Sequence, residues 1–332
     1  MPMSGLMWRW LGVMLFARVM WAGSLGAEVP PPGEWTCAYR MRGEVRLLLF
    51  WVGRDGVGGG SVSFRRSPGS APGTWSEEVE LVFGSDPGRV PGRVNRWGHA
   101  RERADWETVG RQPTLVRTVF DGLMRHSESR TPAGVLAGHR SETARGLYEY
   151  KALHSEVARH GALAEIRVFH DPREFHYRTP EPLLSRYREV VASQSPHQLT
   201  RLSNSPAHYS SPSGFLSGLR ALIDRVLDMP AGGPRSAAVR PSAIIVHNAA
   251  LYRLDVKQVA YAATWPGLPE AGEVAGIRFQ TVRLEHKNCS EFSIAVPVHG
   301  PLRGIPVCIE YQPNWWLRVR LDLERPAPRQ RP

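Results

Sequence analysis

The densest group of side chains that could do chemistry is the segment Asn95-Arg96-Trp97-Gly98-His99, which places an amide, a guanidinium, an indole and an imidazole around one glycine. Such a cluster could bind a polar ligand, because it combines hydrogen-bonding groups with an apolar ring face. The alternative is that Trp97 packs in the core while Asn95 and His99 satisfy local backbone groups. We favour this alternative.

A second segment, His170–His176, contains two histidines and two acids and so has the composition of a metal site. Pro172 prevents a regular helix there, so the helical His-Glu-x-x-His geometry of zinc hydrolases is absent. On a strand, at about 3.3 Å per residue, His170 and His176 would lie about 20 Å apart, which is too far for one ion. We therefore predict no metal site.

The glycine cluster Gly53–Gly60 superficially resembles a phosphate-binding loop. It lacks the terminal Gly-Lys-Ser/Thr, and no helical pattern follows it, so we interpret it as a hairpin connection between two strands. No cofactor is predicted.

Signatures of catalysis are also missing. The chain has no Gly-x-Ser-x-Gly, no Ser-x-x-Lys and no paired metal ligands. A Ser/His/Asp site with dispersed members leaves no local motif, so a secreted hydrolase is kept as the alternative to a non-enzymatic binding or structural protein. No catalytic residue is assigned.

The three cysteines, Cys37, Cys289 and Cys308, lie far from any C-x-x-C spacing. A zinc ribbon or thioredoxin-type motif therefore cannot be built from them. One pair could be bridged in an exported protein, and the sequence does not say which. For each cysteine the preferred interpretation is a buried, unreactive thiol.

The N-terminus has the layout of a secretory signal. One basic residue, Arg9, precedes the apolar run Leu11–Ala17, and small residues follow at Gly23, Ser24, Gly26 and Ala27. A spanning helix needs about 20 apolar residues, and Arg18 interrupts the run, so a permanent anchor is too short. We expect residues 1–27 to be cleaved; an uncleaved anchor and a misassigned start codon are the alternatives.

Export sets the expected compartment. Glu28 stands where a lipid-anchored protein needs a cysteine, so a lipoprotein is rejected. We expect a periplasmic or extracellular protein that is not an integral membrane protein after cleavage. Residues 28–324 would form a β-rich domain, which could divide into two lobes near residues 125–146, and residues 325–332 would be a disordered tail.

Positive charge is the main compositional feature. The chain carries 42 Lys and Arg against 31 Asp and Glu, and only Lys151, Lys257 and Lys287 are lysines. The arginines are spread along the whole chain among acids, whereas a nucleic-acid binder more often concentrates basic residues on one face or in one run. We predict no specific nucleic-acid partner and interpret the arginines as a codon bias that places Arg where other proteins use Lys.

Apolar alternation predicts many strands and two helices. The helices are 183–195 and 212–228, the second with Ser211 as N-cap and Pro212 at the first helical position. The expected fold is mainly β with a few helices (α+β): a twisted antiparallel sheet or half-barrel with the helices packed on one face. The expected strands are 35–41, 45–52, 61–64, 77–83, 147–150, 164–169, 244–246, 251–256, 277–284, 292–298, 305–311 and 317–323.

Several features of residues 211–324 resemble one family. They are a helix from Gly214 to Asp228, an extended hairpin, the strand entry Gly276-Ile-Arg-Phe279, and a closing pair of strands with Ile305-Pro-Val307, Glu310-Tyr311 and Leu321. This pattern resembles the end of a family of bacterial envelope domains of unknown function, which are similar to the half-barrels of outer-membrane lipoprotein carriers. Val274-Ala275 replaces the Thr-Pro usual in that family, and Trp315-Trp316 is outside its pattern. The family has no established catalytic residues to carry over.

These expectations lead to a functional hypothesis. A curved sheet that two helices cover only in part leaves a concave apolar area, which is a candidate pocket for an apolar small molecule, a lipid or an envelope partner protein. Trp97, Trp315 and Trp316 are the expected rim, because an indole offers an apolar face and one donor. Arg96 and His99 are further candidates, and ordinary core or edge packing is the alternative for all three tryptophans.

Overall fold

The structure is a computed structural model. It describes residues 33–47, 50–86, 88–90, 97–110, 112–125, 148–160, 163–177, 198–203, 213–229, 241–247, 250–284, 289–314 and 317–324. The predicted leader, the predicted helix 183–195, the predicted boundary between lobes and the predicted C-terminal tail lie outside these residues, apart from Arg125 at the end of a strand.

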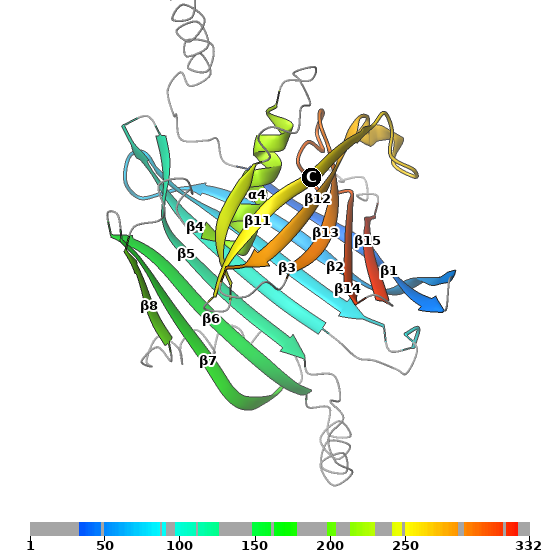
Figure 1. Ribbon diagram of the computed structural model, residues 1–332, viewed down its shortest axis with the longest axis horizontal. Helices are drawn as coiled ribbons and strands as arrows, with labels where there is room; N and C mark the ends of the chain where they lie inside the picture. Colours follow the sequence, from blue (N-terminus) through cyan, green and yellow to red (C-terminus); the bar gives the residue numbers. More distant parts are fainter. Residues whose placement is uncertain are drawn as a thin grey trace, which may run out of the picture.

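One curved sheet contains the fifteen strands of the described chain, in the order β8-β7-β6-β5-β4-β3-β2-β1-β15-β14-β13-β12-β11-β10-β9 (Figure 1). The strands are β1 (Gly33–Leu47), β2 (Phe50–Pro68), β3 (Thr74–Ser85), β4 (Trp97–Val109), β5 (Gln112–Arg125), β6 (Tyr148–His160), β7 (Leu163–Tyr177), β8 (Gln198–Ser203), β9 (Ser213–Gly214), β10 (Ser242–His247), β11 (Ala250–Ala262), β12 (Val274–Arg283), β13 (Cys289–Pro297), β14 (Cys308–Asn314) and β15 (Leu317–Leu323).

Two antiparallel meanders make up this sheet. Strands β1–β8 form the N-terminal arm, and β10–β15 form the C-terminal arm together with the short β9, which pairs parallel to β10. The first and last strands join the arms, from Tyr39 opposite Leu323 to Val45 opposite Leu317. The sheet is therefore centred on a pairing between the two ends of the domain.

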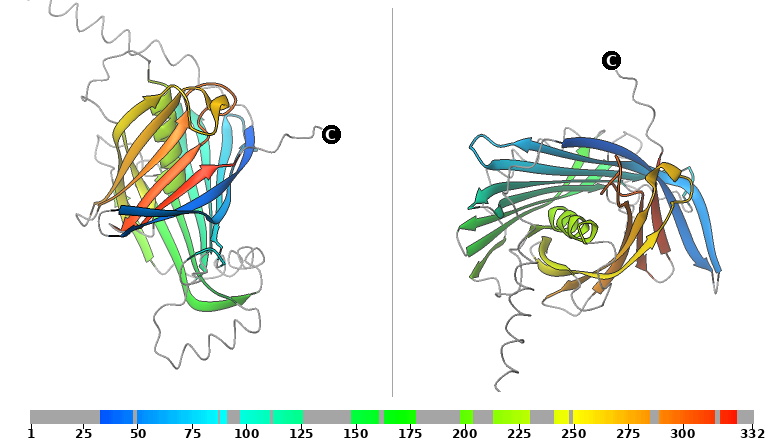
Figure 2. Two further views of the ribbon diagram at one scale, coloured as in Figure 1. Left: turned by 90° about the vertical axis from the view of Figure 1, so that its right-hand side faces the viewer. Right: turned by 90° about the horizontal axis from the view of Figure 1, so that it is seen from above.

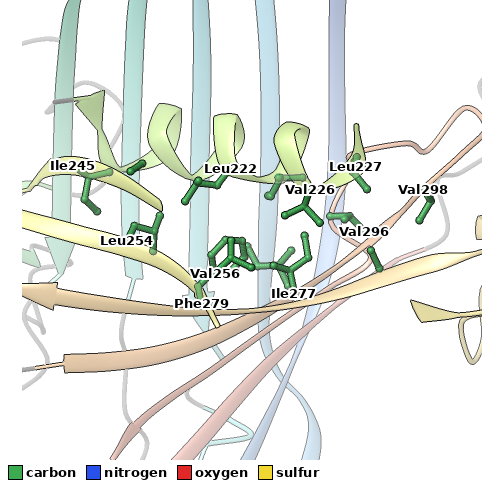
Figure 3. Packing of buried hydrophobic residues seen from close by; sticks show 14 residues of the cluster. Leu222, Val226, Leu227, Ile245, Leu254, Val256, Ile277, Phe279, Val296 and Val298 are labelled. Carbon is green, nitrogen blue, oxygen red and sulfur yellow. The ribbon is translucent and has the colours of Figure 1, made fainter. Parts of the chain in front are cut away.

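The helix α4 (Phe215–Leu227) lies between the two arms, on the inner face of the curved sheet (Figure 2). Leu222 and Val226 are almost completely buried and pack against the C-terminal arm in the main hydrophobic core, which includes Leu254 and Phe279 (Figure 3). The fold is thus mainly β and barrel-like, with a helix on one face of the sheet, as the sequence predicts.

The start of this helix differs from the prediction. Ser213 and Gly214 form β9 beside Ile245 and Val246, and Gly214 is the N-cap, so the helix begins at Phe215 rather than at residue 212. Because the N-cap residue is a glycine, it has no side chain that could accept a hydrogen bond from the first turn of the helix. A carboxylate from another strand replaces this cap, which a local sequence pattern does not reveal.

The structure also corrects two predictions, that Gly53–Gly60 connect two strands and that residues 45–52 form one strand. The hairpin falls inside the predicted strand 45–52, with Val45 opposite Val52, and Gly58–Gly60 lie within β2. Glycine is needed at Gly58 and Gly60, because a Cβ there would lie 2.1 Å and 1.9 Å from backbone oxygens of β3. Gly56 has a φ of 64° at an irregularity in the β1–β2 pairing.

Strands β4 and β5 occupy a region where no strand was predicted. Arg101 and Arg103 alternate with Glu102 and Ala104 along β4. In β4 the residues are therefore polar or small rather than apolar, so this strand lacks the alternation of apolar and polar residues that usually indicates a half-buried strand.

The thiols agree with the sequence interpretation only in part. Cys37 and Cys308 are buried, whereas Cys289 is exposed, and the three cysteines form no disulfide. Cys289 is exposed because it is the first residue of β13, next to the connection from β12.

Candidate ligand site between the helix and the sheet

An apolar cavity of about 390 Å³ lies between α4 and the inner face of the sheet. Both arms contribute to its wall. The described residues that line it are Trp35, Val62, Phe64, Val79, Leu81, Phe83, Phe215, Leu216, Leu219, Arg220, Ile223, Thr281, Ser290, Phe292, Ile294, Gly304, Pro306, Ile309, Tyr311 and Leu321.

Strand alternation builds the wall from the N-terminal arm. Val79, Leu81 and Phe83 of β3 face the cavity, so Glu78 and Glu80 between them face outward. Phe64 lies opposite Val79 in the neighbouring strand. The side chains that line the cavity are therefore the inward half of an ordinary alternating pattern.

The C-terminal arm supplies the other wall by the same rule. Phe292 and Ile294 of β13 lie opposite Tyr311 and Ile309 of β14. Tyr311 is 44% exposed although it lines the cavity, so the cavity reaches the surface there. Beside this opening the hydroxyl groups of Thr281 and Ser290 lie 3.1 Å apart.

The face of α4 that carries Leu219 and Ile223 closes the cavity. Glu102 of β4 holds the beginning of this helix. Its carboxylate accepts hydrogen bonds from the N–H groups of Leu216 (3.0 Å) and Ser217 (2.7 Å) and from the hydroxyl of Ser217 (2.6 Å).

Glu102 therefore does the work of a missing N-cap side chain. An anion at this position is favourable, because the first N–H groups of a helix have no partner within the helix and carry partial positive charge. Burial raises the pKa of Glu102, while the hydrogen bonds from Ser217 and Leu216 act in the opposite direction. A Cβ at Gly214 would lie 2.4 Å from this carboxylate, so a larger residue there would displace the Glu102 side chain from its hydrogen bonds.

Arg220 is the one charged residue among the described residues that line the cavity. Its guanidinium carbon lies 4.0 Å from the centre of the Phe64 ring, in a cation–π contact. Arg66 approaches the same ring at 5.5 Å and is bonded to Glu77 at 2.7 Å. A guanidinium thus takes part in a wall that is otherwise apolar and aromatic.

The structure places the predicted site residues elsewhere or does not describe them. Arg96, Trp315 and Trp316 lie outside the described residues. Trp97 is half-buried and lines a shallow depression on β2 and β3 with Gly58–Gly60, and it does not line the apolar cavity.

His99 is buried two residues further along β4. Its Nε2 lies 2.6 Å from Glu80 Oε1. Because Glu102 faces the helix, alternation puts His99 on the outer face, away from the cavity. The ligand-binding role of the predicted residues stays a prediction.

Sequence reasoning missed the residues that line the cavity. The signal was present in part, because the strand 77–83 was predicted and the apolar stripe of the helix 212–228 was expected to pack on the sheet. Arg220 was the informative exception, a charged residue next to Leu219 on that stripe.

A second titratable cluster lies on β5 and β6. His154 Nδ1 is 2.7 Å from Asp121 Oδ1, and its Nε2 is 3.5 Å from Glu156 Oε1. Burial opposes the charged imidazolium, but the hydrogen bonds and charges of Asp121 and Glu156 outweigh it and raise the pKa of His154 to about 9. Both ring nitrogens of His154 face carboxylates, so neither is placed to take a proton from a serine, as the general base of a Ser/His/Asp hydrolase does.

The described residues contain neither a cluster of metal ligands nor a membrane-spanning helix. No three His, Cys, Asp or Glu side chains come together there in a way that could hold a metal ion. Within the same residues, no helix is both long enough and apolar enough to cross a membrane.

No protein-family model matches the chain, and no curated protein matches it. The chain is similar to the crystal structure of a beta-barrel-like protein of a domain of unknown function from Brucella abortus, with a TM-score of 0.44 and 7% sequence identity over 89% of this chain and 96% of that one.

Proposed function

We propose that this protein binds an apolar, lipid-like ligand in the cavity between α4 and the sheet. The observation that carries the proposal is the cavity itself, which is about 390 Å³ in volume, lined almost entirely by aliphatic and aromatic side chains, and open beside Tyr311. Small-molecule sites in proteins are concave, mostly apolar and about 300–1,000 Å³ in volume.

The size of the cavity limits the ligand it can take. An apolar ligand gains contacts with the walls and removes apolar surface from water, and this favourable term grows with the area it buries. At about 30 Å³ for each water-sized group, the cavity has room for about a dozen such groups. This is the size of one alkyl chain rather than of a multi-chain lipid.

Export is part of the same proposal. The leader pattern of residues 1–27 supports a site of action outside the cytoplasm, in the periplasm or the extracellular space. Membranes there are a source of single-chain amphiphiles.

The experiment is a titration of the purified protein with Nile red, a neutral apolar dye whose fluorescence rises in apolar surroundings. We expect saturable binding of one dye molecule per protein. Leu219→Trp fills the cavity from the helix and should weaken binding at least tenfold. Val109→Trp adds the same indole at a position that is 56% exposed, so it should bind like the wild type.

Thermal unfolding followed by circular dichroism shows whether each variant is folded. If the folded wild type shows no saturable binding, the proposed function is wrong. If folded Leu219→Trp binds the dye as well as Val109→Trp does, the ligand site lies elsewhere.

A further inference from the structure

The polar groups of the cavity are unevenly distributed. Thr281 and Ser290 come from β12 and β13, and their hydroxyl groups lie close to each other. Arg220 comes from α4 and lies against Phe64 of β2. An alkyl chain matches the apolar walls of the cavity. It offers no negatively charged group to the guanidinium of Arg220.

The position of this charge is fixed by its contacts. Phe64 is buried, and the Arg220 guanidinium carbon is 4.0 Å from its ring centre, so the side chain is held against the wall. Arginine bound to an aromatic face keeps N–H groups for other partners, and those groups match the two oxygens of a carboxylate or phosphate.

The Arg220 side chain can be reached by a ligand, because it lines the cavity and is 25% exposed. Its Nε is buried and has no hydrogen-bond partner among the described residues. Asp224 Oδ2 lies 3.7 Å from this Nε, which is within the range of an ion pair but too long for a hydrogen bond. An anionic head group that reaches the guanidinium from the cavity would add charge-assisted hydrogen bonds, which a neutral head group cannot do.

The neighbouring acids do not replace such an acceptor. Glu77 accepts two hydrogen bonds from Arg66. The Asp224 side chain is 44% exposed, so water screens its ion pair with Arg220.

We propose that the cavity selects a single-chain amphiphile with an anionic head group, and that Arg220 binds this head group. The inference rests on the proposed function and deepens it. The shared chemistry is an alkyl chain of about a dozen carbons that ends in a carboxylate or a phosphate. A neutral or cationic head group would form no charge-assisted hydrogen bond with Arg220.

The test compares four ligands with the same alkyl chain. Dodecanoate, dodecyl phosphate, dodecanol and dodecylammonium each compete with Nile red at pH 8, below their micelle concentrations. A charge-assisted hydrogen bond corresponds to about a tenfold or larger gain in affinity. We therefore expect at least one of the two anions to bind at least tenfold more tightly than dodecanol, and dodecylammonium to bind least well.

Substitutions of arginine assign the preference. Arg220→Gln should abolish the preference for the anions and leave the affinity for dodecanol within about twofold, because only the charge-assisted bonds are lost. Arg220→Lys should retain a reduced preference, since lysine keeps the charge without the planar fork. Arg225→Gln, on the exposed side of the same helix, should behave like the wild type.

The outcomes separate the two proposals. If none of the four ligands displaces the dye, the proposed function fails together with the inference. If dodecanol binds as tightly as both anions, the cavity binds lipid-like chains but the inference is wrong. An unchanged preference in Arg220→Gln or Arg220→Lys also overturns it, because Arg220 would then not be the head-group residue.

Discussion

Glu102 and Ser217 are 115 positions apart in the chain, and the Glu102 carboxylate accepts hydrogen bonds from both the N–H and the hydroxyl of Ser217, at 2.7 Å and 2.6 Å. This contact connects the N-terminal arm of the sheet to the helix that closes the cavity. The position of α4, and with it the shape of the ligand site, depends on a side chain from β4.

Removing this carboxylate should destabilise the protein. Glu102→Ala leaves the first N–H groups of α4 buried without partners, so we expect a loss of about 2–4 kcal/mol in the free energy of unfolding. Glu102→Gln keeps one acceptor oxygen and should lose less. Urea unfolding followed by circular dichroism measures both values, and Glu107→Gln on the exposed end of β4 is the control. Equal stability of Glu102→Ala and this control would contradict the assigned role.

Because of His154, the folded protein should become less stable at alkaline pH. Its pKa is raised from the ordinary value of 6.5 to about 9 by Asp121 and Glu156, against the effect of burial. The stabilisation is therefore complete below about pH 6.5 and is lost as the pH rises through about 9. One pKa unit corresponds to about 1.4 kcal/mol, so the total is on the order of 3 kcal/mol.

The melting temperature measured from pH 6 to pH 10 tests this dependence. It should fall across the upper part of the range in the wild type and change less in His154→Gln. His299→Gln is the matched control, because the His299 side chain is 77% exposed. If His154→Gln and the wild type show parallel curves, His154 is not the group responsible.

Secondary structure could be predicted from the sequence where apolar residues recur on one face of an element and that face is buried. Val79 and Leu81 alternate with Glu78 and Glu80, and this pattern predicted the strand, whose apolar residues face the cavity in the structure. The apolar stripe of α4 predicted the helix for the same reason. Along β4, by contrast, the inward position of Glu102 binds a helix and the outward arginines form ion pairs, so neither face is strongly apolar.

The ligand site could not be predicted because its parts meet only through the sheet order. Phe64 and Leu321 line one cavity although they are distant in sequence, and the pairing of β1 with β15 brings their strands together. No local pattern encodes that pairing. Tryptophan was used as the marker of a rim, whereas in the described residues phenylalanine and aliphatic side chains form most of the wall.

Ion pairs between strands indicate how the protein uses its arginines. Arg65 pairs with Glu34, Arg101 with Glu78 and Arg117 with Glu156, each across two neighbouring strands. Because these charges are balanced locally, we predict only weak binding to duplex DNA at physiological salt, without site preference. Gel-shift assays at about 150 mM salt test this, and sub-micromolar binding that depends on sequence would contradict it.

Export predicts a defined N-terminus. The small residues after the apolar run favour cleavage between Gly23 and Glu28, so the secreted form should begin within that interval. N-terminal sequencing of the protein recovered from outside the cytoplasm gives the position. A protein that begins at Met1 and remains in the cytosol would show that the leader is not a signal peptide.

The three thiols should react at very different rates. A thiolate is the reactive form, and burial raises the pKa of Cys308 to about 12, so this side chain is almost entirely in the unreactive form at neutral pH. Cys37 is also buried, whereas Cys289 is exposed at the start of β13. A maleimide should therefore add one label to the native protein and three labels after unfolding, as mass spectrometry of the intact chain would show.

Cys289→Ser should remove the label gained under native conditions and leave the other two sites unchanged after unfolding. Rapid labelling of Cys308 in the native Cys289→Ser variant would mean that the pairing of β14 with β13 and β15 opens readily, because the thiol must leave the core before it can react.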